Sequence, residues 1–312
     1  LPTLKKLIKE GTSGELISTM PPLTPPAWAS FATGVNPGKH GVYDFWHVDG
    51  TKMTSVTSDS IRRETLWSML NEADKKVVLI NAPMTYPLRK INGVVVTGLM
   101  TPGDIPYTYP ENLRRELLKE VPEYRVYTRT DPYENEALYL EEAYVLLRAR
   151  RDATLYLMKN YDWDLLVSVF YYTDQIQHVF WKYMDPTHPA HNKDAPKSLK
   201  EAIGKAYEIV DDSVRKILEE IDEDTTLIVM SDHGAGPIYK NVFVNNYLRK
   251  VGIMKMSTAG AIKLTLNNFL KAFGVREERL LHILKYIKGP SKAILNKLGA
   301  VKESSYSVFF TK

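Results

Sequence analysis

Cysteine is absent from this 312-residue chain, and its absence excludes disulfide bonds and thiolate ligands for a metal. Any metal ion must therefore be held by His, Asp, Glu or hydroxyl side chains. Long hydrophobic runs are absent as well, since stretches such as Lys76–Ala82 and Trp163–Phe170 are too short to cross a bilayer. No secretory signal is visible, and we expect a cytoplasmic protein, although the start at Leu1 within a helical pattern indicates that residues precede it.

The composition is that of a folded globular protein, with 44% hydrophobic and 25% charged residues. A chain of this length can bury the core of a single α/β domain that carries an insertion. The charge is unevenly spread, because basic residues far outnumber acidic ones between Arg249 and Lys302. We interpret this region as a helical insertion with solvated lysines. The alternative is a surface that attracts anionic lipid, nucleic acid or a phosphorylated substrate.

Short β-branched runs alternate with helical patterns in the first part of the chain. Nearly continuous apolar runs are typical of strands covered on both faces, as in a parallel sheet, and they occur at 76–80, 94–97, 165–170 and 226–230. Helical patterns separate the runs, at about 60–71, 110–119, 134–160 and 199–220. The alternation predicts an α/β fold with a mostly parallel central sheet flanked by helices.

The strand signal ends after about Arg249, where amphipathic helical stretches follow. We predict helices there at 262–273, 279–287 and 290–298. The sequence therefore predicts three parts, namely a catalytic core over 1–248, a basic helical insertion or cap over 249–303, and the start of a return strand to the core at 304–312.

Two of the predicted strands end beside an acidic residue and a histidine, at the edge where ligands bind in open α/β sheets. The first pair is Asp174 and His178, whose i,i+4 spacing puts both side chains on one face of a following helix. The second pair is Asp232 and His233, in a loop where Gly234 lets the backbone turn closely. Carboxylate and imidazole together are good ligands for zinc or manganese, although each pair alone also fits a chance match or a polar turn.

Thr24 precedes a segment that reads as a helix, with Pro25 at the favoured first helical position. We expect the threonine to cap this helix. Its hydroxyl would then lie beside free backbone N–H groups and the positive end of the helix dipole, which together attract a phosphate. Taken alone, the segment is better explained as a structural cap.

These three segments, in this order, resemble the alkaline phosphatase superfamily and, within it, the type I phosphodiesterase/nucleotide pyrophosphatase branch. The resemblance rests on Thr24 with Thr33-Gly34 and His40-Gly41 downstream, followed by both acid–histidine pairs, and it covers about 1–248. It implies an alkaline-phosphatase-like core whose first strand lies before Leu1. It also implies metal-dependent hydrolysis of phosphate esters.

The resemblance assigns a role to each matching residue. It implies that Thr24 is a nucleophile that forms a covalent phosphothreonine, and that two divalent metal ions, zinc or manganese, clamp the reacting oxygens. Thr24, Asp232 and His233 would bind one ion, and Asp174 and His178 the other. We expect a small phosphorylated or nucleotide-like substrate and no specific binding of nucleic acid. Contact with a membrane surface through the basic helical segment is the less favoured interpretation.

Three departures from the family pattern keep other interpretations open. The family's first acidic ligand would lie before Leu1, and its late histidine has no good counterpart, since His282 lies in an amphipathic helical pattern. Ala27 stands where nucleotide pyrophosphatases usually carry an asparagine that helps to hold a phosphate oxygen. The alternatives are a cofactor-independent phosphomutase or other phosphoryl transferase of the same superfamily, and a non-catalytic anion-binding domain.

Other polar residues have structural explanations. We expect His40 to shape the turn into a strand at 42–45, and His188 and His191 to lie in an exposed loop. Asp211 and Asp212 lie inside a helical pattern and are expected to face solvent.

Overall fold

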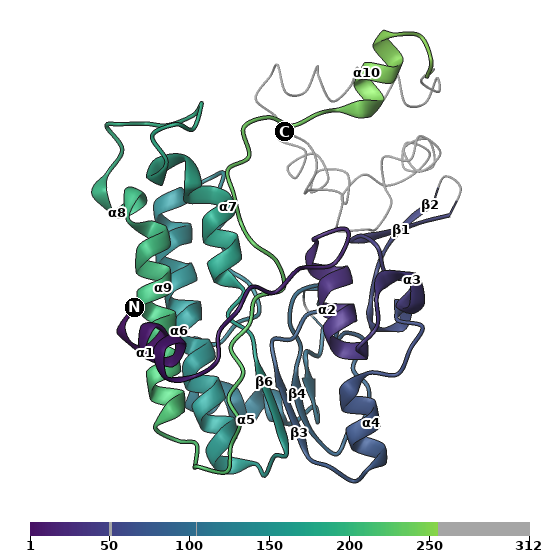
Figure 1. Cartoon of the computed structure of the whole chain (residues 1–312), viewed down its shortest axis with the longest axis vertical. Helices are drawn as coiled ribbons and strands as arrows, with labels where there is room; N and C mark the ends of the chain where they lie inside the picture. The colour runs from purple at the N-terminus through teal and green to yellow at the C-terminus, as the bar shows by residue number, and fades with distance from the viewer. Residues whose placement is uncertain (50–51, 104, 255–312) are drawn as a thin grey trace, which may run out of the picture. The chain divides into compact units, whose positions relative to one another are not determined.

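The computed structural model describes residues 1–49, 52–103 and 105–254, and the chain divides at Tyr239 into two compact units. The first unit contains a sheet whose strands run in the order β5-β4-β3-β6 (Figure 1). Three strands are parallel and β5 is antiparallel to β4; the bounds are β3 Val77–Ile80, β4 Gly93–Val96, β5 Thr108–Tyr109 and β6 Leu165–Ser168. The predicted α/β class is confirmed, with a mixed sheet.

Helices surround this sheet and follow the predicted helical patterns closely. The pattern predicted at 60–71 corresponds to α4 (66–72), which begins later than predicted, and those at 110–119, 134–160 and 199–220 correspond to α5 (113–120), α6 (136–160) and the pair α8 (197–200) and α9 (202–218). The helices of the first unit are α1 (Pro2–Glu10), α2 (Thr24–Thr33), α3 (Pro37–His40), η1 (Ser58–Ser60), α4 (Leu66–Glu72), α5 (Leu113–Glu120), α6 (Glu136–Asn160), α7 (Tyr172–Met184), α8 (Lys197–Lys200) and α9 (Ala202–Leu218).

The two faces of the sheet are covered by different helices because alternate residues of a strand point to opposite sides. Val78 and Ile80 of β3 pack in one cluster with residues of α5 and α6. Val77 and Leu79 point the other way, into a cluster that includes Trp67 of α4 and a residue of α2. The result is a layered α/β arrangement, in which the sheet lies between α6 on one side and α2 and α4 on the other (Figure 1).

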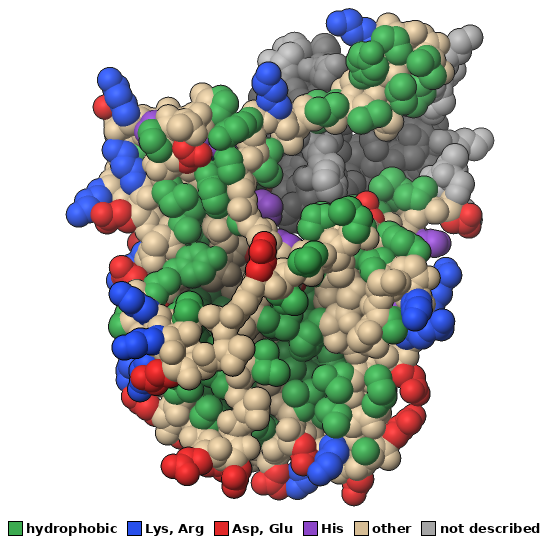
Figure 2. Space-filling view, viewed as in Figure 1, with side chains coloured by type: hydrophobic (Ala, Val, Ile, Leu, Met, Phe, Trp, Pro, Cys, Tyr) green, Lys and Arg blue, Asp and Glu red, His purple; other side chains and the backbone are tan. Residues whose placement is uncertain are grey.

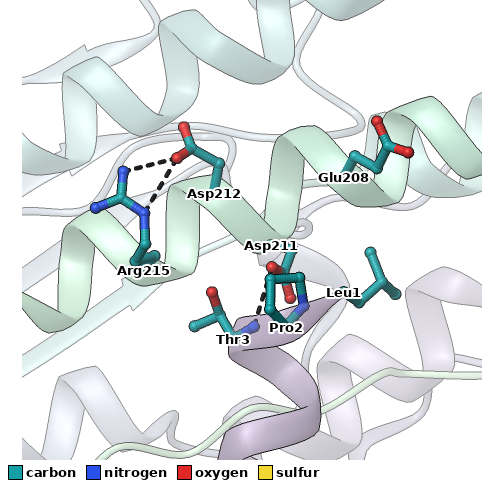
Figure 3. A pocket seen from close by; sticks show the side chains of 7 residues that line it. All are labelled: Leu1, Pro2, Thr3, Glu208, Asp211, Asp212 and Arg215. Atoms are coloured by element: carbon teal, nitrogen blue, oxygen red, sulfur yellow. Dashed lines mark hydrogen bonds and ion pairs between the residues drawn. The ribbon is translucent and has the colours of Figure 1, made fainter.

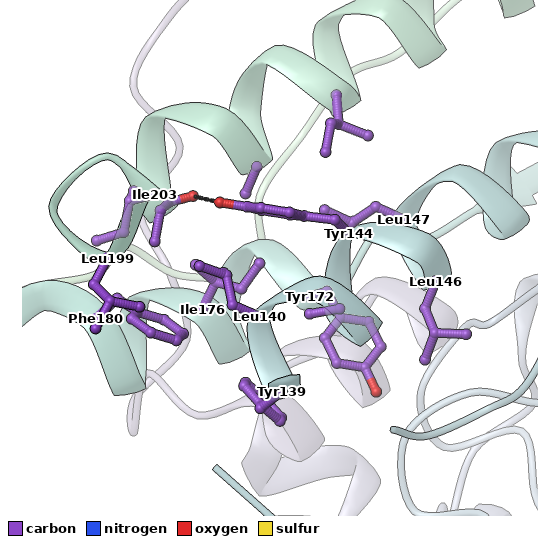
Figure 4. Close-up of a cluster of buried hydrophobic side chains, with 14 residues drawn as sticks. Tyr139, Leu140, Tyr144, Leu146, Leu147, Tyr172, Ile176, Phe180, Leu199 and Ile203 are labelled. Atoms are coloured by element: carbon purple, nitrogen blue, oxygen red, sulfur yellow. Dashed lines mark hydrogen bonds between the residues drawn. The ribbon is translucent and has the colours of Figure 1, made fainter. Parts of the chain in front are cut away.

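Helix α6 belongs to two hydrophobic clusters. Its C-terminal half packs on the sheet through Ala149, Ala153 and Leu157. Its N-terminal half packs with residues of α7 and α9 in a second cluster (Figure 4). There the hydroxyl of Tyr144 donates to the backbone carbonyl of Ala202 at 3.0 Å. One helix therefore joins the sheet to the helical layer.

The predicted strand at 226–230 is wrong, because this segment pairs with no strand of the described residues. Its apolar side chains stay exposed, with Ile228 at 77% and Val229 at 56%. Figure 2 shows hydrophobic side chains uncovered on the face along which this segment runs. An apolar run favours a strand only when a neighbour supplies backbone hydrogen bonds. Among the described residues the sheet ends at β6, and no strand lies beside residues 226–230 to supply those bonds.

Asp211 does not face solvent, contrary to expectation. The residue is 3% exposed, and its carboxylate accepts hydrogen bonds from the backbone N–H groups of Thr3, at 3.1 Å, and Leu4, at 2.8 Å. Helix α1 has no side-chain cap of its own, so Asp211 of α9 supplies one from across the fold (Figure 3). Burial raises the pKa of Asp211, but hydrogen bonds from Leu4 and Thr3 and the nearby N-terminal charge lower it, and the pKa lies below its usual value. Asp212 does point outward, to Arg215.

A small antiparallel sheet is formed by β1 (Trp46–Asp49) and β2 (Lys52–Ser55), so the strand predicted at 42–45 begins later, at Trp46. The described part of the second unit contains α10 (Val244–Lys250). The helices predicted at 262–298 and the return strand at 304–312 lie outside the described residues. None of the described helices combines the length and the apolar character needed to cross a membrane.

Candidate active site

Thr24 is the first residue of α2, and Leu23 rather than Thr24 is the N-cap. The prediction that Thr24 caps this helix is therefore wrong, because the N-cap lies one residue earlier. Pro25 and Pro26 follow and lack N–H groups, while the N–H of Ala27 already donates to Leu23 O at 3.0 Å. The helix start therefore offers a phosphate its dipole and few donors, fewer than the sequence suggested. The Thr24 hydroxyl is not used to cap the start of α2.

The hydroxyl of Thr24 lies 3.1 Å from Nε2 of His233. The other ring nitrogen of His233, Nδ1, lies 2.9 Å from the backbone carbonyl of Gly234. A carbonyl can only accept, so Nδ1 carries the proton and Nε2 has a free lone pair in the neutral ring. The predicted nucleophile and one predicted ligand, 209 positions apart in sequence, therefore meet directly.

Asp232 lies beside the same ring, with Oδ2 at 3.4 Å from His233 Nε2. This oxygen is buried and has no hydrogen-bond partner in the described part of the chain. Burial raises the pKa of Asp232, and the nearby carboxylate of Asp174 raises it further, against the opposing effect of His233. A buried carboxylate oxygen that accepts no hydrogen bond lowers the stability of the fold. Such unsatisfied groups are typical of functional sites.

Asp174 and His178 form the second predicted pair, on the first two turns of α7. The predicted i,i+4 contact is present, with Asp174 Oδ1 at 3.3 Å from His178 Nε2. Burial raises the pKa of Asp174, but its interactions with His178, together with the hydrogen bond from Gln175, lower the pKa overall. The same hydrogen bond raises the pKa of His178. The charge of His233 also contributes to lowering the pKa of Asp174.

The chemistry of these side chains fits a divalent cation. Asp232 Oδ2 has a free lone pair, and His233 donates Nδ1–H to a carbonyl, as metal-binding histidines usually do. Across residues 1–49, 52–103 and 105–254, however, no three His, Asp or Glu side chains are arranged to hold one ion. The described residues thus offer two ligand pairs and the Thr24 hydroxyl.

Several neighbours of the site carry no sequence signal. The hydroxyl of Ser18 donates to the backbone carbonyl of Asp232 at 2.6 Å, across 214 positions, and no motif marks it. Gln175 donates its side-chain N–H to Asp174 Oδ2 at 2.9 Å, and its position next to the aspartate is the one available hint. His188 and His191 lie in the loop after α7, where they contact backbone carbonyls rather than the site.

His40 supports the helix that carries Thr24. It is fully buried, its Nδ1 accepts from the N–H of Val42 at 3.1 Å, and its Nε2 lies 2.9 Å from the hydroxyl of Ser30 on α2. The expected role in shaping a turn is confirmed. Burial lowers the pKa of His40, so the buried ring is neutral.

We expect His40→Ala to lower the free energy of unfolding by about 1–3 kcal/mol, because Ser30 and the Val42 N–H lose their partner. Urea denaturation measures this, with the exposed His47→Ala as the matched control. The wild-type stability should also fall as the pH drops below about 6.5, because the unfolded histidine then takes up a proton that the folded one resists. A His40→Ala protein that keeps this pH dependence would assign it to another group.

A comparison with protein families gives one clear result. The sequence model of the family described as type I phosphodiesterase / nucleotide pyrophosphatase matches residues 1–303. The matched span contains all five predicted site residues, namely Thr24, Asp174, His178, Asp232 and His233. No curated protein and no solved structure matches the chain.

Proposed function

Because the chain belongs to the type I phosphodiesterase / nucleotide pyrophosphatase family, we propose that it is a metal-dependent hydrolase of phosphate esters that acts through Thr24. The observation that carries the proposal is the 3.1 Å contact between the Thr24 hydroxyl and His233 Nε2. A buried Asp232 carboxylate lies beside this contact, and Asp174 lies close enough to interact with both. A hydroxyl, two carboxylates and two imidazoles are side chains that suit phosphoryl transfer assisted by metal ions.

The proposed reaction has two halves. The Thr24 oxygen attacks phosphorus, the bond from phosphorus to the leaving oxygen breaks, and a phosphothreonine forms. Water then attacks the same phosphorus, the bond to the Thr24 oxygen breaks, and phosphate or a phosphate monoester leaves. In the metal-free chain, the free lone pair of His233 Nε2 accepts the Thr24 O–H and holds the hydroxyl beside the atom that would bind a metal ion once one is present.

Metal ions would be held by the two acid–histidine pairs. Thr24, Asp232 and His233 would hold one zinc or manganese ion, and Asp174 and His178 would contribute to a second. Bound there, such ions neutralise charge on the phosphate and lower the pKa of coordinated hydroxyl groups. The rest of the chemistry depends on how the chain holds these side chains, through Gly234 O on His233 and Gln175 on Asp174.

The substrate class follows from what surrounds Thr24. Ala27, one turn along α2, is buried and carries no polar atom in its side chain. It cannot hold a phosphate oxygen as the asparagine of nucleotide pyrophosphatases does. We therefore propose a small phosphorylated substrate whose recognition does not depend on this position.

The test compares bis-p-nitrophenyl phosphate with p-nitrophenyl phosphate, using the full chain reconstituted with Zn²⁺ or Mn²⁺. We expect metal-dependent release of p-nitrophenol, faster from the diester, and its loss after treatment with a chelator. If the folded, metal-supplied protein turns over neither ester, the hydrolase proposal fails. A phosphomutase or an anion-binding domain would then be the better explanation.

A further inference from the structure

Arg150 carries a positive charge into the interior of the first unit. The side chain is 0% exposed, in the middle of α6. Its guanidinium donates to two backbone carbonyls, from Nη2 to Val126 O at 2.7 Å and from Nη1 to Leu146 O at 3.2 Å, and its Nε meets no acceptor within residues 1–49, 52–103 and 105–254. Among the described residues, it forms no ion pair with a carboxylate. Burying such a charge costs desolvation free energy, so we ask which contacts offset this cost and what the buried arginine does.

Three tyrosine rings surround the guanidinium. Its central carbon lies 5.0 Å from the ring centroids of Tyr171 and Tyr172, and 6.0 Å from that of Tyr124. The rings of Tyr171 and Tyr172 lie 4.5 Å from each other. Cation–π contacts of this kind offset part of the cost of burial. Arg150 is therefore held by aromatic faces and carbonyls, in place of an acid.

Two of these tyrosines form the start of α7, the helix that carries Asp174. Tyr171 is its N-cap, and the carbonyl of Tyr171 accepts from the N–H groups of Asp174, at 3.1 Å, and Gln175, at 3.3 Å. The Tyr171 hydroxyl donates to Val126 O at 3.1 Å, the same carbonyl that Arg150 binds. One carbonyl thus joins the guanidinium to the first turn of α7.

Tyr172 is fixed from two further sides. Its hydroxyl accepts from the backbone N–H of Thr128 at 2.6 Å, and its ring is buried in the cluster shared by α6, α7 and α9 (Figure 4). Arg150 is therefore the central contact of a network that holds the chain from 126–128 against the first turn of α7.

We infer that Arg150 is a positioning residue, which sets the first turn of α7 and thereby directs Asp174 and His178 towards the reacting phosphate. The inference rests on the proposed function. Arginine suits the role because its planar fork donates to two carbonyls while its faces stack on two rings. Lysine keeps the charge but lacks the planar fork and the flat face that stacks on the rings, and methionine has no donor, so neither reproduces the full set of contacts.

The experiment uses the full chain with Arg150→Met and Arg150→Lys, and the exposed Arg148→Met on the same helix as the matched control. Backbone hydrogen exchange at Asp174 and Gln175 reports on the first turn of α7 directly. Titration with Mn²⁺ and the kcat and KM for bis-p-nitrophenyl phosphate report on the site. Circular dichroism and thermal melting establish that each variant is folded.

We expect faster exchange at Asp174 and Gln175 in both Arg150 variants, by about 10-fold, and no change in Arg148→Met. We also expect Mn²⁺ affinity and kcat to fall by about 10-fold or more, with KM little changed, as for residues that orient metal ligands. A role in stability alone would lower the melting temperature but leave the Mn²⁺ affinity of the folded protein unchanged.

The inference is overturned if the folded Arg150 variants match Arg148→Met in exchange at α7. A wild type that neither binds Mn²⁺ nor cleaves the ester would instead count against the proposed function, and the exchange result would still decide the role of Arg150. If both Arg150 variants fail to fold, Tyr171→Phe provides the same comparison, because it removes a single hydroxyl from the network.

Discussion

Thr24→Ala is expected to lower kcat for bis-p-nitrophenyl phosphate by roughly 10³-fold or more, because loss of a nucleophile removes the covalent route altogether. The hydroxyl is the one group of this side chain that faces His233, at 3.1 Å, and alanine leaves the backbone of α2 unchanged. The variant should fold normally and retain affinity for Mn²⁺ through the remaining ligands. Steady-state kinetics of the metal-loaded protein measure the effect.

Two further variants make the Thr24 result specific. Thr24→Ser keeps a hydroxyl and should retain much of the activity. Thr33→Ala removes a hydroxyl at the other end of α2, where it donates to Ala29 O, and should change kcat little. Activity of Thr24→Ala close to that of Thr33→Ala would contradict the assignment of Thr24 as nucleophile.

Asp232→Asn is expected to have the second largest effect, a loss of Mn²⁺ or Zn²⁺ affinity of at least about 100-fold at its site, with a matching loss of activity. Its buried Oδ2 has no hydrogen-bond partner among the residues that the structure describes, and a cation is the group that we propose uses it. Calorimetric titration measures the affinity. Asp212→Asn, on the exposed side of α9, is the control that removes a charge without touching the site.

The same substitution should not lower the melting temperature of the metal-free protein. Burial and the charge of Asp174 raise the pKa of Asp232, which means that the ionised carboxylate opposes folding at neutral pH. Removing that charge should leave the metal-free stability equal or higher. A clear drop in melting temperature, with metal affinity intact, would identify Asp232 as a structural residue instead.

Local patterns predicted much of this fold. The apolar runs at 76–80, 94–97 and 165–170 became β3, β4 and β6, and the i,i+4 spacing of Asp174 and His178 gave a real contact. The contact between Asp174 and His178 depends on residues that are neighbours in sequence. The strands depend on burial, which any helix that covers the sheet can supply. The run at 226–230 met the same criteria and failed, because a strand also needs a partner, and a sequence run does not say whether one lies beside it.

Contacts between residues far apart in sequence could not be predicted from local sequence patterns. Asp211 looked like an outward-facing residue of an amphipathic helix, yet it caps α1 from 207 and 208 positions away. Ser18 likewise supports Asp232 from a segment with no periodicity. Thr24 and His233 were paired through a family resemblance and not through spacing, and their contact depends on how α2 and the loop after residue 230 are placed by the whole unit.

The dual packing of α6 has a consequence for cooperativity. A helix of 25 residues is about 37 Å long, and its two halves lie in different hydrophobic clusters. Neither cluster can unfold without breaking backbone hydrogen bonds of α6, the helix that both share. The sheet and the helical layer should therefore unfold in one transition, and partial unfolding should be confined to segments outside α6.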